Sequence, residues 1–226
     1  MSQIPAGPIS ATRIGLFAPV ASFRDPMFPG VTRCLPVPPP STARGMLAAG
    51  VGQPGYAPML GMAAHAEGAG TDLETYHPIA VDGKNPAIGG RVPARKGGMT
   101  IRERTFLVNL HVTLWVPDED GRQVACALRR PVWALRLGRS QDLVHVTDIR
   151  QVTLEPVSEA NVGWALAPTG AHKAAAASTL RLASIVSLDR LSTRYHSYLW
   201  CPDGGGHRPV ISAYHDQGQA VWLLSP

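Results

Sequence analysis

Charged and aromatic side chains are both scarce in this sequence of 226 residues, at 16% and 6% of the total. Hydrophobic residues make up 45%, which excludes a mainly disordered chain and is typical of a globular protein. Glycine (23) and proline (21) together give 44 residues, which predicts many turns and little helix. A chain of this length can form one large or two small domains with a sizeable core.

Cysteine is scarce as well, and long apolar runs are missing. Cys34, Cys126 and Cys201 are odd in number and lack metal-ligand spacing, so we expect reduced thiols. The first residues lack the basic start and the apolar run of a signal peptide. The longest small apolar stretch, 174–188, is too short and too polar to span a bilayer. We therefore predict a cytoplasmic protein that does not enter a membrane.

Motifs for catalysis or metal binding are incomplete. The sequence Gly-Arg-Ser-Gln-Asp at 138–142 begins like a nucleophile elbow but lacks the closing glycine. Cys201 and His207 supply at most half of a metal site, because no second pair has ligand spacing. The glycines at 204–206 lack the Lys and Ser/Thr of a phosphate-binding loop. We therefore predict no cofactor, no metal and no catalytic residues.

Positive charge is concentrated in one part of the chain. The net charge is +5 and the pI is near 9.4. Residues 91–104 carry five cations and one acid, so 5 − 1 = +4 falls in fourteen residues, whereas residues 45–83 carry four acids and no Lys or Arg. This layout suits a protein with one side facing a polyanion, and the alternative is a solvated basic loop. The five cations are Arg91, Arg95, Lys96, Arg102 and Arg104.

The segment 35–47 has the features of a phosphate-binding turn. Three prolines at 38–40 extend the backbone, so Ser41 or Thr42 can act as the N-cap of a short helix. The free N–H groups of a helix amino terminus carry partial positive charge and bind anions. The alternative is a proline-stiffened connector before an ordinary core helix. The arginines that flank this turn are Arg24, Arg33 and Arg44.

Periodic patterns predict an α+β fold. Residues 13–20 and 105–116 alternate at period two, as strands do, and residues 59–78 can form a bent strand. Helical spacing at 124–128 is followed by a predicted strand at 132–137. Together with the helix after the prolines, this order predicts a ferredoxin-like (RRM-like) βαββαβ domain over 1–156. The glycine-rich stretch 81–100 predicts a long exposed hairpin or loop.

The pattern changes beyond residue 157. Residues 180–191 are predicted to form a helix. Three short strands are predicted at 195–200, 209–214 and 220–224, joined by glycine-rich turns. We therefore predict a small antiparallel β unit over 157–226.

Three separated motifs resemble a known family. They are Ala-Ser-Phe-Arg-Asp-Pro at 21–26, Leu-Pro-Val-Pro-Pro-Pro-Ser-Thr-Ala-Arg-Gly at 35–45 and Leu-Gly-Arg-Ser-Gln-Asp-Leu at 137–143. In this order they resemble the Cas-five family of CRISPR-associated proteins, in the RAMP superfamily, and most of all its type I-B members. The resemblance extends from about residue 13 to residue 154. It implies a ferredoxin-like fold with a long thumb hairpin at about 77–105.

The resemblance also implies a function in antiviral defence. Family members belong to the type I surveillance ribonucleoprotein called Cascade, where they bind and cap the 5′ handle of CRISPR RNA. The expected partners are this RNA, the backbone subunits and the large subunit, with target DNA contacted indirectly. The residues that we expect to bind RNA are Arg24, Arg33, Ser41, Thr42 and Arg44 at the turn, Arg139 and Ser140 in a second loop, and the cations of the thumb, Arg91, Arg95, Lys96, Arg102 and Arg104.

The alternative is an enzyme. Some type I-C relatives cut precursor CRISPR RNA without a metal, using a Tyr, a Lys and a His. This sequence departs from that pattern, because the nearest tyrosine after the prolines is Tyr56 and the strand entry at 101–105 lacks a Lys-His pair. His172 and Lys173 are adjacent but lie far away in the chain. Binding is therefore preferred to cleavage. A protein-only scaffold fits the basic pI less well.

Overall fold

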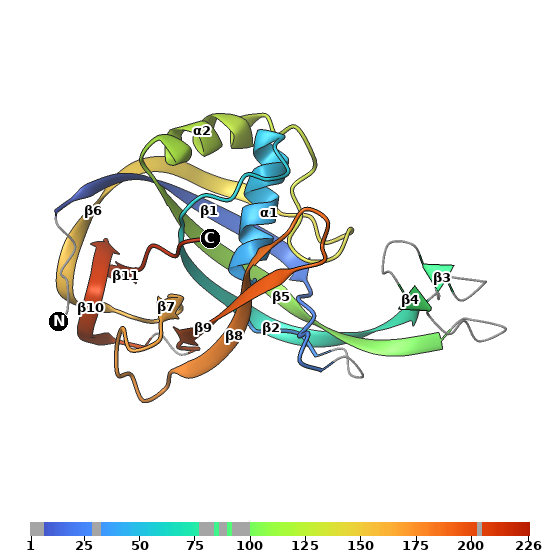
Figure 1. The fold of residues 1–226 in the computed structure, drawn as a ribbon. Helices are drawn as coiled ribbons and strands as arrows, with labels where there is room; N and C mark the ends of the chain where they lie inside the picture. The colour runs from blue at the N-terminus through green and yellow to red at the C-terminus, as the bar shows by residue number, and fades with distance from the viewer. Residues whose placement is uncertain (1–6, 29–32, 77–83, 86–89, 92–99, 203–204) are drawn as a thin grey trace.

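The computed structural model describes residues 7–28, 33–76, 84–85, 90–91, 100–202 and 205–226 (Figure 1). It is a mixed α+β protein built largely from antiparallel strands, which confirms the predicted fold class. In chain order the elements are β1 (Ile9–Ala21), α1 (Pro40–Val51), β2 (Gly61–Tyr76), β3 (Lys84–Asn85), β4 (Gly90–Arg91), β5 (Thr100–Pro117), α2 (Asp118–Arg129), β6 (His145–Asn161), β7 (Ala167–Pro168), β8 (Ser178–Val186), β9 (Thr193–Trp200), β10 (His207–Asp216) and β11 (Gln219–Val221).

The main sheet has six strands in the order β10-β11-β6-β1-β5-β2. β1 lies between β5 and β6 and is antiparallel to both, and β5 is antiparallel to β2. Apart from the two-residue strands β3 and β4, the elements along 9–161 follow the order strand, helix, strand, strand, helix, strand. The last of these strands is not where we predicted it, because 132–137 forms only one bridge, between Arg136 and Leu143. The strand that follows α2 is β6.

The hydrophobic core lies between the sheet and the two helices. Every second residue of β5, from Leu110 to Val116, is buried on one face of the sheet. These side chains belong to the same cluster as Met46 and Leu47 of α1 and Val124 of α2. Figure 1 shows both helices at the same face. The period-two pattern of 105–116 therefore correctly predicts the face that carries the helices.

Helix α1 begins two residues earlier than a Ser41 cap requires and three residues earlier than a Thr42 cap requires. Pro39 is the N-cap, and its carbonyl accepts hydrogen bonds from the N–H groups of Thr42 and Ala43 at 2.8 and 3.2 Å. The prediction that Ser41 or Thr42 caps the helix is wrong, because Pro40 fits the first helical position and needs no N–H partner there. No helix in the described part of the chain is both long and apolar enough to cross a bilayer.

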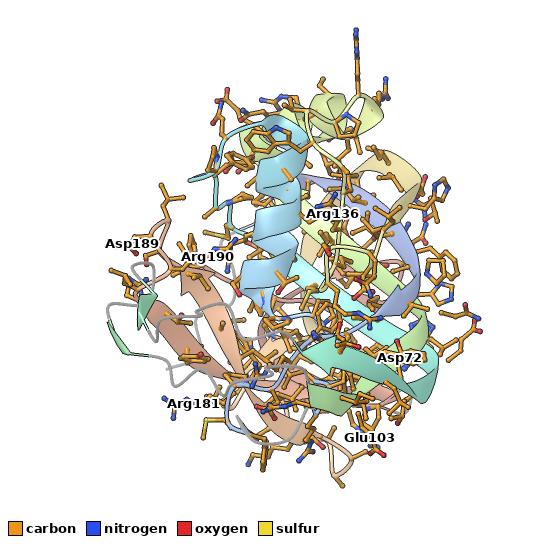
Figure 2. All side chains as sticks on the ribbon, turned by 90° about the vertical axis from the view of Figure 1, so that its right-hand side faces the viewer. Asp72, Glu103, Arg136, Arg181, Asp189 and Arg190 are labelled. Carbon is orange, nitrogen blue, oxygen red and sulfur yellow. The ribbon has the colours of Figure 1, made fainter. Side chains whose placement is uncertain are left out.

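β2 and β5 extend beyond the sheet as a two-stranded arm (Figure 1). Their pairing is continuous from Gly61 with Trp115 to Tyr76 with Thr100. Figure 2 views the molecule from the side of the arm, whose strands carry Asp72 and Glu103. Of the hairpin that we expected at 77–105, the structure describes β3, β4 and residues 100–105, and residues 100–105 belong to the arm. Apart from β3 and β4, which pair with each other, residues 77–99 lie outside the described residues.

In the described residues after 161, all of the regular elements are strands. The predicted helix at 180–191 is wrong, because β8 runs from Ser178 to Val186 and pairs antiparallel with β9. Leu182 and Ser184 are both buried, at the spacing of a strand. β10 and β11 continue the main sheet through β6. Residue 156, where we expected a domain boundary, therefore lies in the middle of β6.

Candidate nucleic-acid interface

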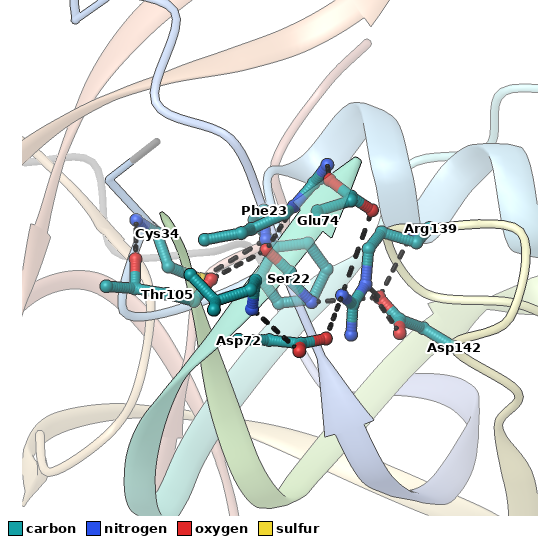
Figure 3. Close-up of polar contacts among 10 residues, drawn as sticks. Ser22, Phe23, Cys34, Asp72, Glu74, Thr105, Arg139 and Asp142 are labelled. Carbon is teal, nitrogen blue, oxygen red and sulfur yellow. Dashed lines mark hydrogen bonds and ion pairs between the residues drawn. The ribbon is translucent and has the colours of Figure 1, made fainter. Parts of the chain in front are cut away.

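The three motifs that resemble the Cas-five family meet where the arm leaves the sheet (Figure 3). Ser22 belongs to the first motif, and its hydroxyl donates to the carbonyl of Thr105 on β5 at 2.8 Å. The second motif begins with Leu35, whose N–H donates to the carbonyl of Phe23 at 2.7 Å, and the N–H of the preceding Cys34 donates to the Thr105 hydroxyl at 2.7 Å. The third motif contributes Asp142. We call the following residues the arm-base network: Ser22, Cys34, Glu74, Arg104, Thr105, Arg139 and Asp142.

Asp142 is the acceptor that closes the third motif into a loop. Its side chain is 1% exposed and accepts the N–H of Ser22 at 3.0 Å and the N–H of Arg139 at 2.9 Å. Gly138 allows this approach: its φ is 108°, and a Cβ there would lie 2.6 Å from the carbonyl oxygen of Ser22. The motif therefore builds a close contact between two chain segments.

Arg139 and Arg104 are held by acids of the chain itself. The Arg139 side chain is 8% exposed, and its Nε donates to Asp142 at 3.0 Å. Its Nη1 lies 3.7 Å from Asp72 and 4.0 Å from Glu74. Arg104 donates to Glu74 at 2.7 Å and to the Ser22 hydroxyl at 3.0 Å. Acids of the negatively charged stretch 45–83 thus neutralise two of the cations that we assigned to RNA.

Arg44 lies in the interior and does not face solvent. It is 2% exposed, and its guanidinium donates to the carbonyl oxygens of Pro58 at 2.9 Å, Ser184 at 2.7 Å and Leu224 at 2.6 Å. Burial lowers its pKa to about 10, so the guanidinium is still charged at neutral pH. Arg44 therefore joins α1 to β8 and to the C-terminal residues, a role that its place beside the proline turn did not predict.

The other predicted residues are more accessible. Arg24 is exposed and forms a backbone bridge with Cys34, and Arg33 is exposed with its guanidinium 5.2 Å from the centre of the Phe28 ring. Ser140 and Arg102 are exposed as well. The remaining predicted residues are Ser41 and Thr42, which are half-buried, Arg91, whose backbone lies in β4, and Arg95 and Lys96, which lie outside the described residues.

Two of the residues that we weighed for a nuclease site, Tyr56 and His172, each have a hydrogen-bond partner within the chain. The Tyr56 hydroxyl donates to Asp120 at 3.0 Å, and burial followed by this carboxylate raises the pKa of the phenol. His172 is buried, and its Nδ1 accepts the N–H of Ala174 at 3.3 Å. Within the described ranges, no three His, Cys, Asp or Glu side chains are grouped so that they could hold a metal ion.

Sequence reasoning did not identify Ser22, Thr105 or Asp142 as members of the network. The first and last lie inside the quoted motifs, which was the available signal. Their contacts join residues 83 and 120 positions apart, and no local pattern encodes such a distance.

The α+β fold is similar to that of two solved CRISPR proteins. A chain described as "CRISPR RNA-guided surveillance complex" matches with a TM-score of 0.54 and 21% identity, over 89% of this chain and 90% of that chain. The "Crystal structure of a CRISPR protein from Archaeoglobus fulgidus" matches with a TM-score of 0.51 and 11% identity, over 96% and 100%. At these identities the likeness concerns the fold alone.

The family follows from the sequence match. Residues 13–198 match the model of the family described as CRISPR-associated protein (Cas_Cas5), so this chain belongs to the Cas-five family. The resemblance predicted from the three motifs is thereby confirmed. No curated protein matches the chain. Similarity to type I-B in particular stays a prediction.

Proposed function

We propose that this protein binds and caps the 5′ handle of CRISPR RNA in a type I surveillance complex, without cutting it. The observation that carries the proposal is the arm-base network, where the three family motifs meet. The cations beside it that are exposed are Arg24, Arg33 and Arg102. Its partners would be the backbone subunits and the large subunit. The match to a chain of an RNA-guided surveillance complex supports membership of such an assembly.

The geometry divides the expected RNA contacts into two groups. Arg24, Arg33, Arg102 and Ser140 are exposed around the arm base, and these we assign to RNA phosphates. A second group fixes the surface that carries them, because its guanidiniums are already bound by acids or carbonyls of the chain. That group is Arg44, Arg104 and Arg139.

The proposal is tested by purifying the tagged chain from its native host. We expect short RNAs that share one repeat-derived 5′ end, together with the backbone and large subunits in the mass spectrum. Reversing two exposed charges, Arg24→Glu with Arg33→Glu, should strip this RNA from the complex. The matched control is Arg208→Glu, which changes an exposed arginine on β10. Wild-type protein that carries neither RNA nor partners would contradict the proposal.

Cleavage is tested separately with the same protein. Repeat RNA incubated with the purified chain and EDTA should remain intact and bound. A single defined cut would show instead that the protein is a metal-independent endoribonuclease.

A further inference from the structure

The segment 129–136, which begins at the last residue of α2, carries three arginines with no acid nearby in the chain. Residues 121–141 contain five arginines and no Asp or Glu. Two of the five are neutralised, since Arg122 pairs with Glu119 and Arg139 with Asp142. The other three are exposed, and their side chains have no ion-pair or hydrogen-bond partner among the residues that the structure describes. These three are Arg129, Arg130 and Arg136.

Trp133 lies between these arginines and is 49% exposed. Its backbone is held in place, because the N–H groups of Val132 and Trp133 donate to the carbonyls of Gly50 and Ala49 at 3.1 Å each. Two residues further on, Leu135 is buried and its carbonyl accepts the N–H of Val144. An exposed indole on a fixed backbone loses little conformational entropy when a ligand binds.

The chemistry of this segment matches single-stranded nucleic acid. Proteins bind single strands by stacking bases on aromatic side chains while arginines track the phosphates. Three unpaired guanidiniums favour a polyanion over an ordinary protein partner, because charged residues are depleted at the centre of protein interfaces. A duplex offers no free base face to the indole, so the exposed Trp133 favours unpaired nucleotides.

The segment leads directly to the arm base. From Arg136 the chain reaches Arg139, whose guanidinium lies 3.7 Å from Asp72 on the arm. In Figure 2, viewed from the side of the arm, Arg136 is drawn beside α1 and above Asp72. We infer that Trp133 stacks on an unpaired base of the bound guide RNA while Arg129, Arg130 and Arg136 contact its phosphates. This inference rests on the proposed function and extends the RNA path from the arm base to the end of α2.

The test compares RNA binding by the full chain in two forms of one ligand. Fluorescein-labelled single-stranded repeat RNA, and the same strand annealed to its complement, are titrated by fluorescence anisotropy. Trp133→Ala should weaken binding of the single strand by about 5- to 150-fold, the range for losing one base stack. Binding of the duplex should stay within about twofold, and Trp133→Phe should keep most of the single-strand affinity, because a phenyl ring still stacks.

The arginines give a second, independent measurement. Replacing Arg129, Arg130 and Arg136 with alanine should weaken both ligands and lower the salt slope on the single strand by about 2, from three contacts at about 0.7 each. The control for both variants is Leu188→Ala, which removes an exposed apolar side chain from the turn after β8. Thermal unfolding of each variant, compared with the wild type, checks that the fold is intact.

The outcomes separate this inference from the proposed function. Unchanged single-strand affinity in Trp133→Ala would overturn the inference, and so would an equal loss on strand and duplex. If Arg24→Glu with Arg33→Glu then still abolishes RNA binding, the proposed function stands alone. If Trp133→Ala releases a protein subunit from the native complex and leaves RNA affinity unchanged, the segment is a protein interface. Wild-type protein that binds neither ligand contradicts both.

Discussion

Arginine performs opposite tasks in two neighbouring regions of this molecule. Arg104 and Arg139, in the arm-base network, are held by carboxylates of the chain, and Arg44, on α1, is held by backbone carbonyls. In 129–136, three arginines extend into solvent with no partner among the described residues. A buried cation requires acceptors to offset its lost hydration, whereas an exposed cation requires none. Contacts between residues far apart in the chain therefore decide which arginines remain accessible to a ligand.

The largest expected effect is the loss of stability when Arg44, an enclosed arginine, is replaced. Arg44→Met keeps an unbranched side chain of similar length but removes the donors to the carbonyls of Pro58, Ser184 and Leu224. We expect the free energy of unfolding to fall by about 2 kcal/mol or more, since each buried unpaired acceptor costs about 1–3 kcal/mol and the Leu224 carbonyl keeps another donor, the N–H of Leu60. Urea denaturation measures the change.

Two controls calibrate this result. Gly45→Ala changes the next residue of α1, where a Cβ would meet nothing within 4 Å, and should stabilise the protein by about 0.5–1 kcal/mol. Alanine at Arg129, Arg130 or Arg136 should change stability by about 0.5 kcal/mol or less, as exposed positions do. If Arg44→Met cost no more than these arginine variants, the contrast between the two regions would be wrong.

A smaller difference in stability is expected between alanine substitutions at two glycines that both have a positive φ. Gly138 has φ 108° and Gly170 has φ 84°. Alanine at Gly170 would meet nothing within 4 Å and should cost only the backbone strain, about 1–2 kcal/mol. Alanine at Gly138 would lie 2.6 Å from the Ser22 carbonyl and 2.9 Å from Asp142, so about 1–3 kcal/mol of overpacking should be added.

Thermal unfolding can distinguish Gly138→Ala from Gly170→Ala, because a loss of about 1 kcal/mol lowers the unfolding midpoint by about 2–4 °C for a chain of this size. We expect Gly138→Ala to unfold at a clearly lower temperature than Gly170→Ala. Equal midpoints would mean that the loop at 138–142 can move away from Ser22. The arm-base network would then be a loose surface loop without a fixed geometry.

The sequence predicted those features that depend on local periodicity. The alternation in β5 predicted a strand and its buried face, and the prolines predicted the start of α1 to within two or three residues. The strand predicted at 132–137 failed because the N–H groups of Val132 and Trp133 bind α1 instead of a neighbouring strand. The helix predicted at 180–191 failed because pairing with β9 outweighs local helix propensity.

The candidate site was predictable only in its motifs. Arg24, Arg33 and Ser140 lie at the surface that the motifs indicated, while Arg44 faces the interior. The acceptors that enclose Arg44 are backbone carbonyls at positions 58, 184 and 224, and every residue type presents a carbonyl. No side-chain pattern could reveal them. The exposure of Trp133 depends on the hydrogen bonds that hold 132–133 against α1, and no local sequence pattern encodes these contacts.

The smallest expected effect concerns His172, a buried side chain that is neutral in the folded protein, whereas the buried Arg44 is charged. His172 is buried, its Nδ1 accepts the N–H of Ala174, and its Nε2 has no partner among the described residues. Burial lowers its pKa below the ordinary 6.5, so the folded protein keeps the ring neutral. Below pH 6.5 the unfolded chain binds a proton that the folded chain does not. Stability should therefore fall as the pH drops through 6.5, by at most about 1.4 kcal/mol per pH unit.

His172→Asn tests this prediction, because the amide oxygen of asparagine can accept the Ala174 N–H and does not titrate. Urea unfolding of the wild type and the variant between pH 7.5 and 5 should show a smaller loss of stability in the variant. Some loss should persist, since burial and then the neighbouring His111 also lower the pKa of His65. Identical slopes would mean that His172 takes up its proton in the folded state. A buried cation would then exist here without the enclosing acceptors that Arg44 has, against the rule drawn from the two regions.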